Sequence, residues 1–440
     1  MQTASLFMKI IKRLGVILVW FAGLAFIFAA ANKNDPYLIA LRGAGNIILV
    51  VVSIAVLIVL IRRGYWRRRA IAGRLLVLLW CIPSLAMLCA QASFEIRKRN
   101  VLQTDVALAR NLGQHFMVGY SSFPEVAAQA EKGLIAGIYI TRHNVRGGVE
   151  TLKSEISSLQ EKRRAAGLPP LIVAADQEGG IVSHLSPPLT KLPALSTVAS
   201  LPPDARAEKA EAFGRLHGRE LAMLGVNLNL APVLDLRPEA GRNRFDFNTL
   251  IGYRAISNDP AVVADIAKSY VHGLEASGVG ATVKHFPGLG RVRGDTHHFS
   301  AGLDAPVAEL EASDWRPFRE VLVGSRAQLM IGHVTLSAVD PDRAASHSRL
   351  VVDGIVRKKW NYQGVIMTDD LVMGAIYQNN VCTAVVEALN AGVDLLLVAF
   401  DGAQFYRIFA CAKEASSRGK LDPTTLRDSE ARLKGAFPVD

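Results

Sequence analysis

The sequence predicts an α/β protein in which N-terminal transmembrane helices precede a (β/α)8 barrel of the TIM type. Two observations predict this fold. Three long apolar runs lie within residues 1–95. Beyond them, in residues 101–440, short β-branched apolar runs alternate with amphipathic helical stretches, which is the pattern of βα units around a parallel sheet. Eight such units fit a barrel of ordinary size, and a doubly wound open sheet is the competing architecture.

The net charge excludes one class of function. The 440 residues carry a formal charge of +11, but residues 1–100 hold 14 Lys and Arg against 2 Asp and Glu, a net +12. Residues 101–440 hold 36 against 37, a net −1. A nucleic-acid-binding domain needs a basic face, so we expect no nucleic-acid partner.

The apolar runs at 14–31, 46–61 and 75–92 are predicted to cross a membrane. A spanning helix needs about 20 residues, which the first and third runs supply and the second reaches when residues 41–45 are included. We therefore expect residues 1–95 to form a membrane anchor. Buried helices of a soluble domain are the alternative, disfavoured by the continuity of the runs and their basic flanks.

Basic residues set the expected orientation, because short cytoplasmic loops retain Lys and Arg. Lys9, Lys12 and Arg13 precede the first span, and six arginines between residues 62 and 74 separate the second from the third. Three spans then place residues 101–440 on the extracytoplasmic side of the cytoplasmic membrane, despite the basic residues at 97–99. Residues 29–31 resemble a signal-peptidase site, and cleavage there would leave the same final side.

Eight short apolar runs are the candidate barrel strands, with helical stretches such as 149–164, 205–224, 261–278 and 381–392 between most of them. The strands are predicted at 114–118, 137–141, 171–175, 227–234, 281–285, 329–334, 364–368 and 394–400. Catalytic residues in such barrels lie at the C-terminal strand ends. Ionisable or polar residues occur there on five strands: Asp176, Gln177 and Glu178; Asp235; Lys284 and His285; His333; and Asp369 and Asp370. This convergence indicates an enzyme.

Asp369 follows an apolar run directly, so a rigid strand end would hold its carboxylate. Such placement suits a nucleophile that attacks the anomeric carbon of a sugar. A helix N-cap is the competing role for an Asp before a helix. We assign capping to Asp370 and the nucleophile to Asp369.

The stretch 284–297, KHFPGLGRVRGDTH, supplies a candidate proton donor. Asp295 can hold the imidazole of His297 in one tautomer, and the pair can act as acid and then base near neutrality. The glycines at 288, 290 and 294 would let the loop move over a substrate. A solvated surface loop is the alternative interpretation.

The cysteines and histidines do not predict a metal site. The four cysteines follow no metal-ligand spacing, and we expect all of them to be small buried hydrophobes. They are Cys81, Cys89, Cys382 and Cys411. A metal-dependent hydrolase using His285, His333 and Asp369 is disfavoured, because the first strand offers only His115 where such barrels have two histidines. We expect neither a metal nor a cofactor.

These motifs resemble the β-N-acetylhexosaminidases of glycoside hydrolase family 3. The resemblance covers most of residues 105–420. It rests on DQEGG at 176–180, LAPVLDL at 230–236, the region 254–260 ending in NDP, KHFPG at 284–288, DTH at 295–297 and MTDDLVMGA at 367–375. The β-glucosidases of the family lack the Asp-x-His loop and take a Glu acid/base from an additional C-terminal domain, which favours the hexosaminidase branch for this chain.

The resemblance implies an activity and a set of site residues. It implies retaining, exo-acting release of terminal N-acetylglucosamine (GlcNAc) from cell-wall-type glycans, through a glycosyl-enzyme intermediate. Asp369 would be the nucleophile and His297 the acid/base, supported by Asp295. The implied sugar contacts come from four further residues. They are Asp176, Arg254, Lys284 and His285.

The sequence departs from the family pattern at three positions. Ile181 and His184 stand where the family has arginines, the second of which usually contacts the sugar, and Leu289 stands where the family has histidine. These departures motivate two alternatives: a catalytically weak sugar-binding membrane protein, and a family 3 glycosidase of other sugar specificity.

Overall fold

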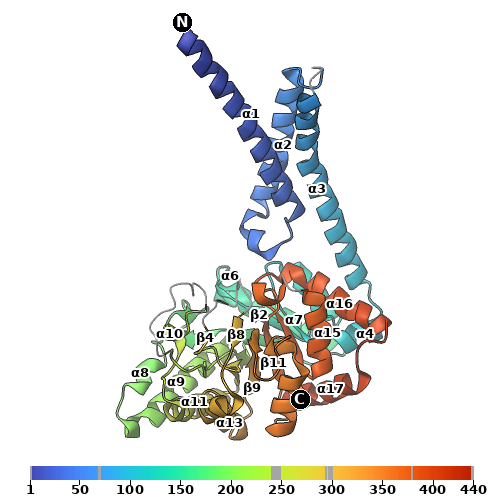
Figure 1. Ribbon diagram of the computed structural model, residues 1–440. Coiled ribbons are helices and arrows are strands. Elements are labelled where there is room, and N and C mark those ends of the chain that lie inside the picture. The colour runs from blue at the N-terminus through green and yellow to red at the C-terminus, as the bar shows by residue number, and fades with distance from the viewer. Residues whose placement is uncertain are drawn as a thin grey trace. The chain divides into compact units, whose positions relative to one another are not determined.

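The computed structural model describes residues 2–67, 71–238, 249–292, 295, 301–377 and 380–437. The chain divides into two compact units, Met1–Val101 and Leu102–Asp440. Each unit is described by itself below, because their relative placement is not determined (Figure 1). The expected His297 lies outside the described residues, as do Gly294 and two of the loop arginines, at 68 and 69.

Three long apolar helices make up most of the N-terminal unit. They are α1 (Gln2–Ala31), α2 (Ala44–Arg62) and α3 (Ile71–Leu102), with the 3-10 helix η1 (Pro36–Leu41) between the first two. Their segments Arg13–Ala31, Ala44–Arg62 and Ile71–Leu102 are long and apolar enough to cross a membrane, which confirms the three predicted helices. A small cluster around Trp80, whose indole N–H donates to the carbonyl of Val19 at 3.3 Å, holds α1 against α3.

Eight parallel strands close into a barrel in the C-terminal unit, which confirms the predicted (β/α)8 fold. The strand order around the barrel is β1, β12, β11, β9, β7, β6, β3 and β2. Their bounds are β1 (Phe116–Gly119), β2 (Gly137–Ile140), β3 (Ile172–Ala175), β6 (Leu228–Asn229), β7 (Gly280–Phe286), β9 (Gln328–Ile331), β11 (Ile366–Asp370) and β12 (Leu395–Val398). Each overlaps one of the eight predicted runs.

Two of the differences between the observed and the predicted strand bounds bear on the site. β6 is only two residues long, because its register with β7 shifts after Asn229; the chain nevertheless runs on beside β7, with a bridge between Val233 and Lys284. β11 extends two residues further than predicted and includes both Asp369 and Asp370. Four described strands outside the barrel pair in short sheets, β4 (Gln177–Gly179) with β5 (Val182–Ser183) and β8 (Ala301–Leu303) with β10 (Val334–Leu336).

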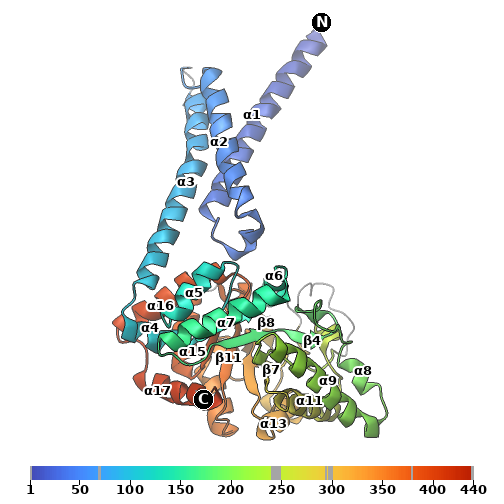
Figure 2. The ribbon, with the colours of Figure 1, turned by 180° about the vertical axis from the view of Figure 1, so that it is seen from behind.

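Helices surround the barrel on the outside (Figures 1 and 2). The longer ones are α5 (Phe123–Glu131), α7 (Val149–Ala165), α9 (Pro203–Met223), α11 (Pro260–Glu275), α13 (Arg316–Val323), η3 (Leu350–Lys359, a π-helix), α15 (Val381–Ala391), α16 (Phe405–Ser417) and α17 (Pro423–Ala436). Short helices in the connections are α4 (Val106–Gly113), α6 (Arg142–Val145), α8 (Ser196–Ala199), α10 (Ile251–Arg254), α12 (Val307–Ala312), η2 (Ala345–His347), α14 (Gly374–Tyr377) and η4 (Gly402–Gln404). Local sequence sets several starts: Asp259 caps α11 and Asp422 caps α17, each followed by a proline.

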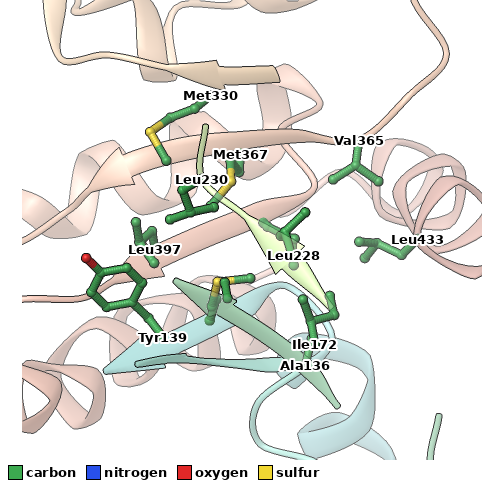
Figure 3. Packing of buried hydrophobic residues seen from close by; sticks show 13 residues of the cluster. Ala136, Tyr139, Ile172, Leu228, Leu230, Met330, Val365, Met367, Leu397 and Leu433 are labelled. Carbon is green, nitrogen blue, oxygen red and sulfur yellow. The ribbon is translucent and has the colours of Figure 1, made fainter. Parts of the chain in front are cut away.

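Apolar side chains from the strands fill the barrel interior (Figure 3). The cluster includes Met117, Leu228, Met330, Met367 and Leu397, all nearly fully buried. Tyr139, from β2, is the polar member of the cluster and is only 5% exposed. The interior is therefore a packed core, and a substrate site can form only where the polar strand ends lie.

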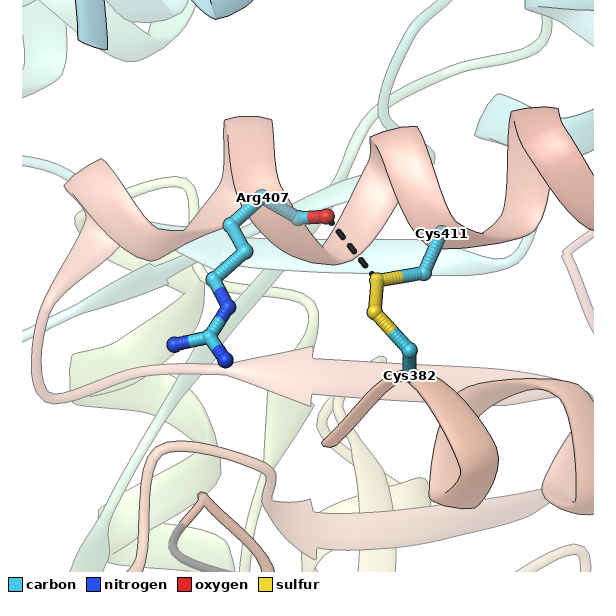
Figure 4. The surroundings of a disulfide bond; sticks show 3 residues. All are labelled: Cys382, Arg407 and Cys411. Atoms are coloured by element: carbon cyan, nitrogen blue, oxygen red, sulfur yellow. Dashed lines mark hydrogen bonds between the residues drawn. A yellow bond between two sulfur atoms is a disulfide. The ribbon is translucent and has the colours of Figure 1, made fainter. Parts of the chain in front are cut away.

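A disulfide joins Cys382 on α15 to Cys411 on α16 (Figure 4). The expectation that all four cysteines are unpaired was wrong for this pair, since 29 residues separate them in the sequence and only the packing of consecutive outer helices brings their Cα atoms to 5.1 Å. Cys81 and Cys89 are free, but they lie exposed on α3 where we expected burial.

Candidate active site

The predicted strand-end residues do converge at one end of the barrel. Asp176 follows β3, Lys284 and His285 lie near the end of β7, and Asp235 lies just beyond the bridge that extends β6. Arg254, from the short helix α10, reaches the same cluster. The four expected sugar-binding residues are thus connected to one another by hydrogen bonds and ion pairs, either directly or through one carboxylate.

That carboxylate belongs to Glu178, to which the sequence assigned no role. The Arg254 guanidinium donates to both Glu178 oxygens, at 2.9 and 2.7 Å, and the Lys284 ammonium lies 2.8 Å from the same side chain. Lys284 also pairs with Asp176. The side chains of Arg254, Lys284 and Glu178 are 9%, 3% and 6% exposed, and that of Asp176 is 18% exposed, so three of the four charged groups are almost without solvent.

The network holds all four groups in their charged forms. Burial by itself would raise the carboxyl pKa values, but the Lys284 charge holds the pKa of Asp176 below its ordinary value, and the Arg254 and Lys284 charges do the same for Glu178. Burial would lower the pKa of Lys284, yet the two carboxylates raise it. Charged donors and acceptors of this kind bind sugar hydroxyls through strong hydrogen bonds.

A hairpin turn places Glu178. β4 and β5 pair antiparallel across Gly179 and Gly180, both of which have positive φ values, +93° and +65°. Glycine adopts this backbone conformation without the steric cost that a side chain would impose. The hairpin therefore brings Glu178 to the network on one strand and carries His184 just beyond the other. Ile181, which follows the turn, is 50% exposed.

His285 is oriented by Asp235, which lies next to it in space. Asp235 accepts hydrogen bonds from the His285 ring Nδ1 at 2.6 Å and from the backbone N–H of Leu289 at 2.7 Å. The Arg254 guanidinium lies 3.3 Å from Nε2. Because arginine can only donate, this contact requires a lone pair on Nε2, and the proton of a neutral His285 is on Nδ1. Asp235 also fixes the backbone at Leu289, so the substitution at this position leaves the loop anchored.

The two adjacent aspartates of β11 have different surroundings. Asp370 is buried and accepts three backbone N–H groups, from Val372 at 3.0 Å, Ala399 at 3.0 Å and Phe400 at 2.7 Å. Burial raises its pKa to about 6. Asp369 is half-buried, and its Oδ1 accepts the N–H of Asp370 at 2.8 Å. The Asp370 carboxylate is therefore used in backbone hydrogen bonds, while the Asp369 carboxylate is partly exposed to solvent.

The loop after β7 is described only in part. Asp295 is 2% exposed and lies 3.4 Å from the Thr249 hydroxyl; its expected partner His297 is outside the described residues. A Cβ on Gly290 would lie 2.2 Å from the carbonyl oxygen of Leu236. Close packing thus requires glycine at this position, where we had expected glycine to provide mobility.

His333 is committed to protein contacts. Its Nδ1 lies 2.8 Å from the Ser346 hydroxyl and its Nε2 lies 3.0 Å from the carbonyl oxygen of Asp370. Both ring nitrogens are therefore engaged within the protein, and Nε2 contacts the end of β11. Within the described ranges, no group of three or more His, Cys, Asp or Glu side chains is arranged to bind a metal.

Residues 107–435 match the family model "Glycosyl hydrolase family 3 N terminal domain". The chain belongs to glycosyl hydrolase family 3. A Beta-hexosaminidase from Tolumonas auensis is 35% identical over 266 residues, which are 59% of this chain and 77% of that protein. A Beta-hexosaminidase from Xylella fastidiosa is 35% identical over 268 residues, 60% of this chain and 76% of that protein.

Solved structures of other family 3 proteins have the same fold. A glycoside hydrolase family 3 beta-N-acetylglucosaminidase from a Paenibacillus species superposes with a TM-score of 0.68 at 29% identity, covering 76% of this chain and 63% of that one. The Beta-N-acetylhexosaminidase from Beutenbergia cavernae gives 0.67 at 27% identity, covering 77% and 100%. In this family 3 hydrolase, the match to the family model begins beyond the end of α3, so the three apolar helices lie outside it.

Proposed function

We propose that this protein is a retaining, exo-acting β-N-acetylhexosaminidase that releases terminal GlcNAc from cell-wall-type glycans. The relatives named Beta-hexosaminidase support the activity, and the solved beta-N-acetylglucosaminidase supports the sugar. The observation that carries the proposal is the contrast within β11. One aspartate is buried in backbone hydrogen bonds, and its neighbour Asp369 is a half-buried carboxylate at the strand end.

The proposed mechanism has two displacements. Asp369 forms a bond to the anomeric carbon while the bond to the aglycone oxygen breaks, and that oxygen takes a proton from His297. His297 then takes a proton from water, whose oxygen bonds to the anomeric carbon as the bond to Asp369 breaks. Asp369 returns as a carboxylate and the anomeric configuration is retained. Asp295 would hold the loop that carries His297.

Substrate binding is proposed for Asp176, Arg254, Lys284 and His285. Their mutual contacts support this assignment, since each side chain is already held in one orientation before a sugar arrives. Preorganised donors and acceptors lose little freedom on binding. The network is electrically balanced, so a neutral sugar can enter without leaving an uncompensated buried charge.

Turnover of 4-nitrophenyl β-N-acetylglucosaminide by the full chain in detergent tests the activity. We expect release that Asp369→Asn abolishes and that Asp265→Asn, on the exposed face of α11, leaves unchanged. A 2-acetamido-5-fluoro sugar should leave a covalent adduct on the peptide containing Asp369. Inversion of the anomeric centre or an adduct elsewhere would refute the mechanism, and sugar binding without turnover would favour a binding protein.

We further propose that residues 1–95 anchor the enzyme in the cytoplasmic membrane and that residues 101–440 lie on its extracytoplasmic side. The arginine-rich loop between α2 and α3 supports this orientation. The disulfide between Cys382 and Cys411 supports it independently, because disulfides persist in oxidising compartments. A C-terminal fusion to alkaline phosphatase should be active and one to a cytoplasm-dependent fluorescent protein dark; the reverse pattern would contradict this topology.

A further inference from the structure

A tyrosine from β2 connects Asp176 to His184. The Tyr139 hydroxyl donates to Asp176 Oδ2 at 2.7 Å and lies 3.1 Å from His184 Nδ1. The other oxygen of Asp176, Oδ1, is paired with the Lys284 ammonium. Both oxygens of this carboxylate are therefore held, one by a cation and the other by a phenol that is itself in contact with an imidazole.

The direction of each hydrogen bond in this chain follows from the protons available. Burial and the neighbouring Asp176 charge raise the pKa of Tyr139, so the phenol keeps its proton. An ionised carboxylate only accepts, and a phenol has one proton to give, so that proton goes to Asp176. The Tyr139 oxygen must then accept from His184, which places a proton on Nδ1. The hydrogen bonds are therefore donated in sequence, from His184 to Tyr139 and from Tyr139 to Asp176.

We infer that Tyr139 and His184 are positioning residues that orient the Asp176 carboxylate for a substrate hydroxyl. The inference rests on the proposed function, because it takes Asp176 as a sugar ligand. The terminal torsion of an Asp side chain is broad, so a single partner on Oδ1 would leave the carboxylate plane poorly defined. The Tyr139 bond to Oδ2 fixes that plane, and each oxygen retains acceptor capacity for a sugar hydroxyl.

His184 strengthens this arrangement from outside the core. Tyr139 is buried in the barrel interior, whereas His184 is half-buried beyond the β4–β5 hairpin. A hydrogen bond received at the phenol oxygen polarises its O–H and makes it a better donor. This role needs only the Nδ1 proton of His184 and not a positive charge. An amide at position 184 is therefore expected to replace the imidazole better than an apolar side chain.

The experiment pairs enzyme variants with deoxy substrates. For 3-, 4- and 6-deoxy analogues of an aryl β-N-acetylglucosaminide, the ratio of parent to deoxy kcat/KM gives the loss on removing each hydroxyl. Asp176→Asn identifies the hydroxyl that Asp176 binds, because the ratio of parent to deoxy kcat/KM should fall in this variant for that hydroxyl. Tyr139→Phe should lower the kcat/KM ratio for the same hydroxyl by about 10- to 100-fold, which is the contribution of a hydrogen bond to a charged group. Most of this effect should come from a higher KM for the parent substrate.

Matched variants separate positioning from general damage to the fold. His184→Leu should lower the kcat/KM ratio for the hydroxyl that Asp176 binds. In His184→Asn this ratio should be close to that of the wild type. Tyr120→Phe is the control, since the Tyr120 hydroxyl also donates to a carboxylate, that of Glu155 at 2.8 Å, outside the proposed network; all three losses should stay at their wild-type values.

An active, folded Tyr139→Phe enzyme with the wild-type losses at every hydroxyl would overturn the inference and leave the proposed function standing. A wild-type protein that neither binds nor turns over any of these sugars would overturn the proposed function, and the inference with it. The two failures are therefore distinguishable in one set of measurements. Near-UV circular dichroism of each variant establishes that it is folded.

Discussion

Replacing Glu178 by glutamine tests whether the buried network behaves as one electrostatic unit. Glu178 is 6% exposed and contacts two cations, Arg254 at 2.7 Å and Lys284 at 2.8 Å. Among the residues that the structure describes, the only other carboxylate paired with them is Asp176, which contacts Lys284. Glutamine keeps the size and one acceptor oxygen, so the variant changes charge while altering packing little. Two buried cations would then share one carboxylate.

The expected cost is large because the uncompensated charge is almost without solvent. Breaking a buried ion pair by removing one partner costs about 3–5 kcal/mol, as the remaining charge cannot be solvated. Glu320→Gln is the matched control. Glu320 also contacts two cations, Lys268 at 2.6 Å and Arg316 at 2.7 Å, but it is 31% exposed. Surface pairs contribute about 0–1 kcal/mol, so this variant should be nearly as stable as the wild type.

Denaturant unfolding of the full chain in detergent, followed by near-UV circular dichroism, measures both variants. A double-mutant cycle adds Arg254→Gln and the Glu178→Gln, Arg254→Gln double variant. We expect the double variant to be more stable than the sum of the two single losses implies, because the second substitution removes one of the unpaired cations. A loss below about 1 kcal/mol for Glu178→Gln, equal to that of the Glu320 control, would refute the argument that burial makes this network a single unit.

Three further predictions concern stability. Burial lowers the pKa of His217 to about 3 from 6.5. Below pH 6.5 the unfolded chain therefore binds a proton that the folded chain does not, and the free energy of unfolding decreases as the pH is lowered. The free energy of unfolding should therefore be lower at pH 5 than at pH 7.5, and this difference should be about 2 kcal/mol smaller in His217→Gln than in the wild type. An unchanged difference would contradict the burial argument. Joint replacement of Cys382 and Cys411 by alanine should cost about 3–4 kcal/mol, because the disulfide closes a loop with a sequence separation of 29; urea midpoints with and without reductant measure it, and a wild type insensitive to reductant would count against it. Gly290→Ala should destabilise the fold by about 1–3 kcal/mol through overpacking against Leu236, and it should also lower kcat, whereas an alanine variant with wild-type thermal midpoint and turnover would show that the loop gives way.

The strands were predictable because each is a short apolar run with polar neighbours, and the barrel follows from their number and spacing. The misjudged details have local causes. β6 stops at Asn229 because its register with β7 shifts there, and the next bridge joins Val233 to Lys284. β11 runs on to Asp370 because its backbone pairing with β12 continues there, where the Leu371 N–H donates to the Leu397 carbonyl at 2.9 Å. Neither cause is visible before the strand neighbours are known.

The site residues were predictable by position, but their partners were not. The rule that barrel chemistry lies at C-terminal strand ends led directly to Asp176, Lys284 and Asp369. Pairings such as Arg254 with Glu178 join residues 76 apart in the chain, and no spacing rule connects them. Tyr139 carried no signal at all, since a tyrosine inside an apolar strand is normally a core residue. His184 stood out only as a departure from the family pattern.

The pair Asp369 and Asp370 illustrates how the fold can position the carboxylate that we propose as the nucleophile. Successive residues of a strand point to opposite sides, so adjacent aspartates at a strand end cannot share one environment. The N–H groups at 372, 399 and 400 converge on Asp370 and tie the β11 end to the loop after β12, while His333 binds the Asp370 carbonyl. These contacts immobilise the backbone immediately after Asp369. If Asp369 is the nucleophile as proposed, Asp370 fixes its position, and the carboxylate is presented by a rigid strand end and not by a flexible loop.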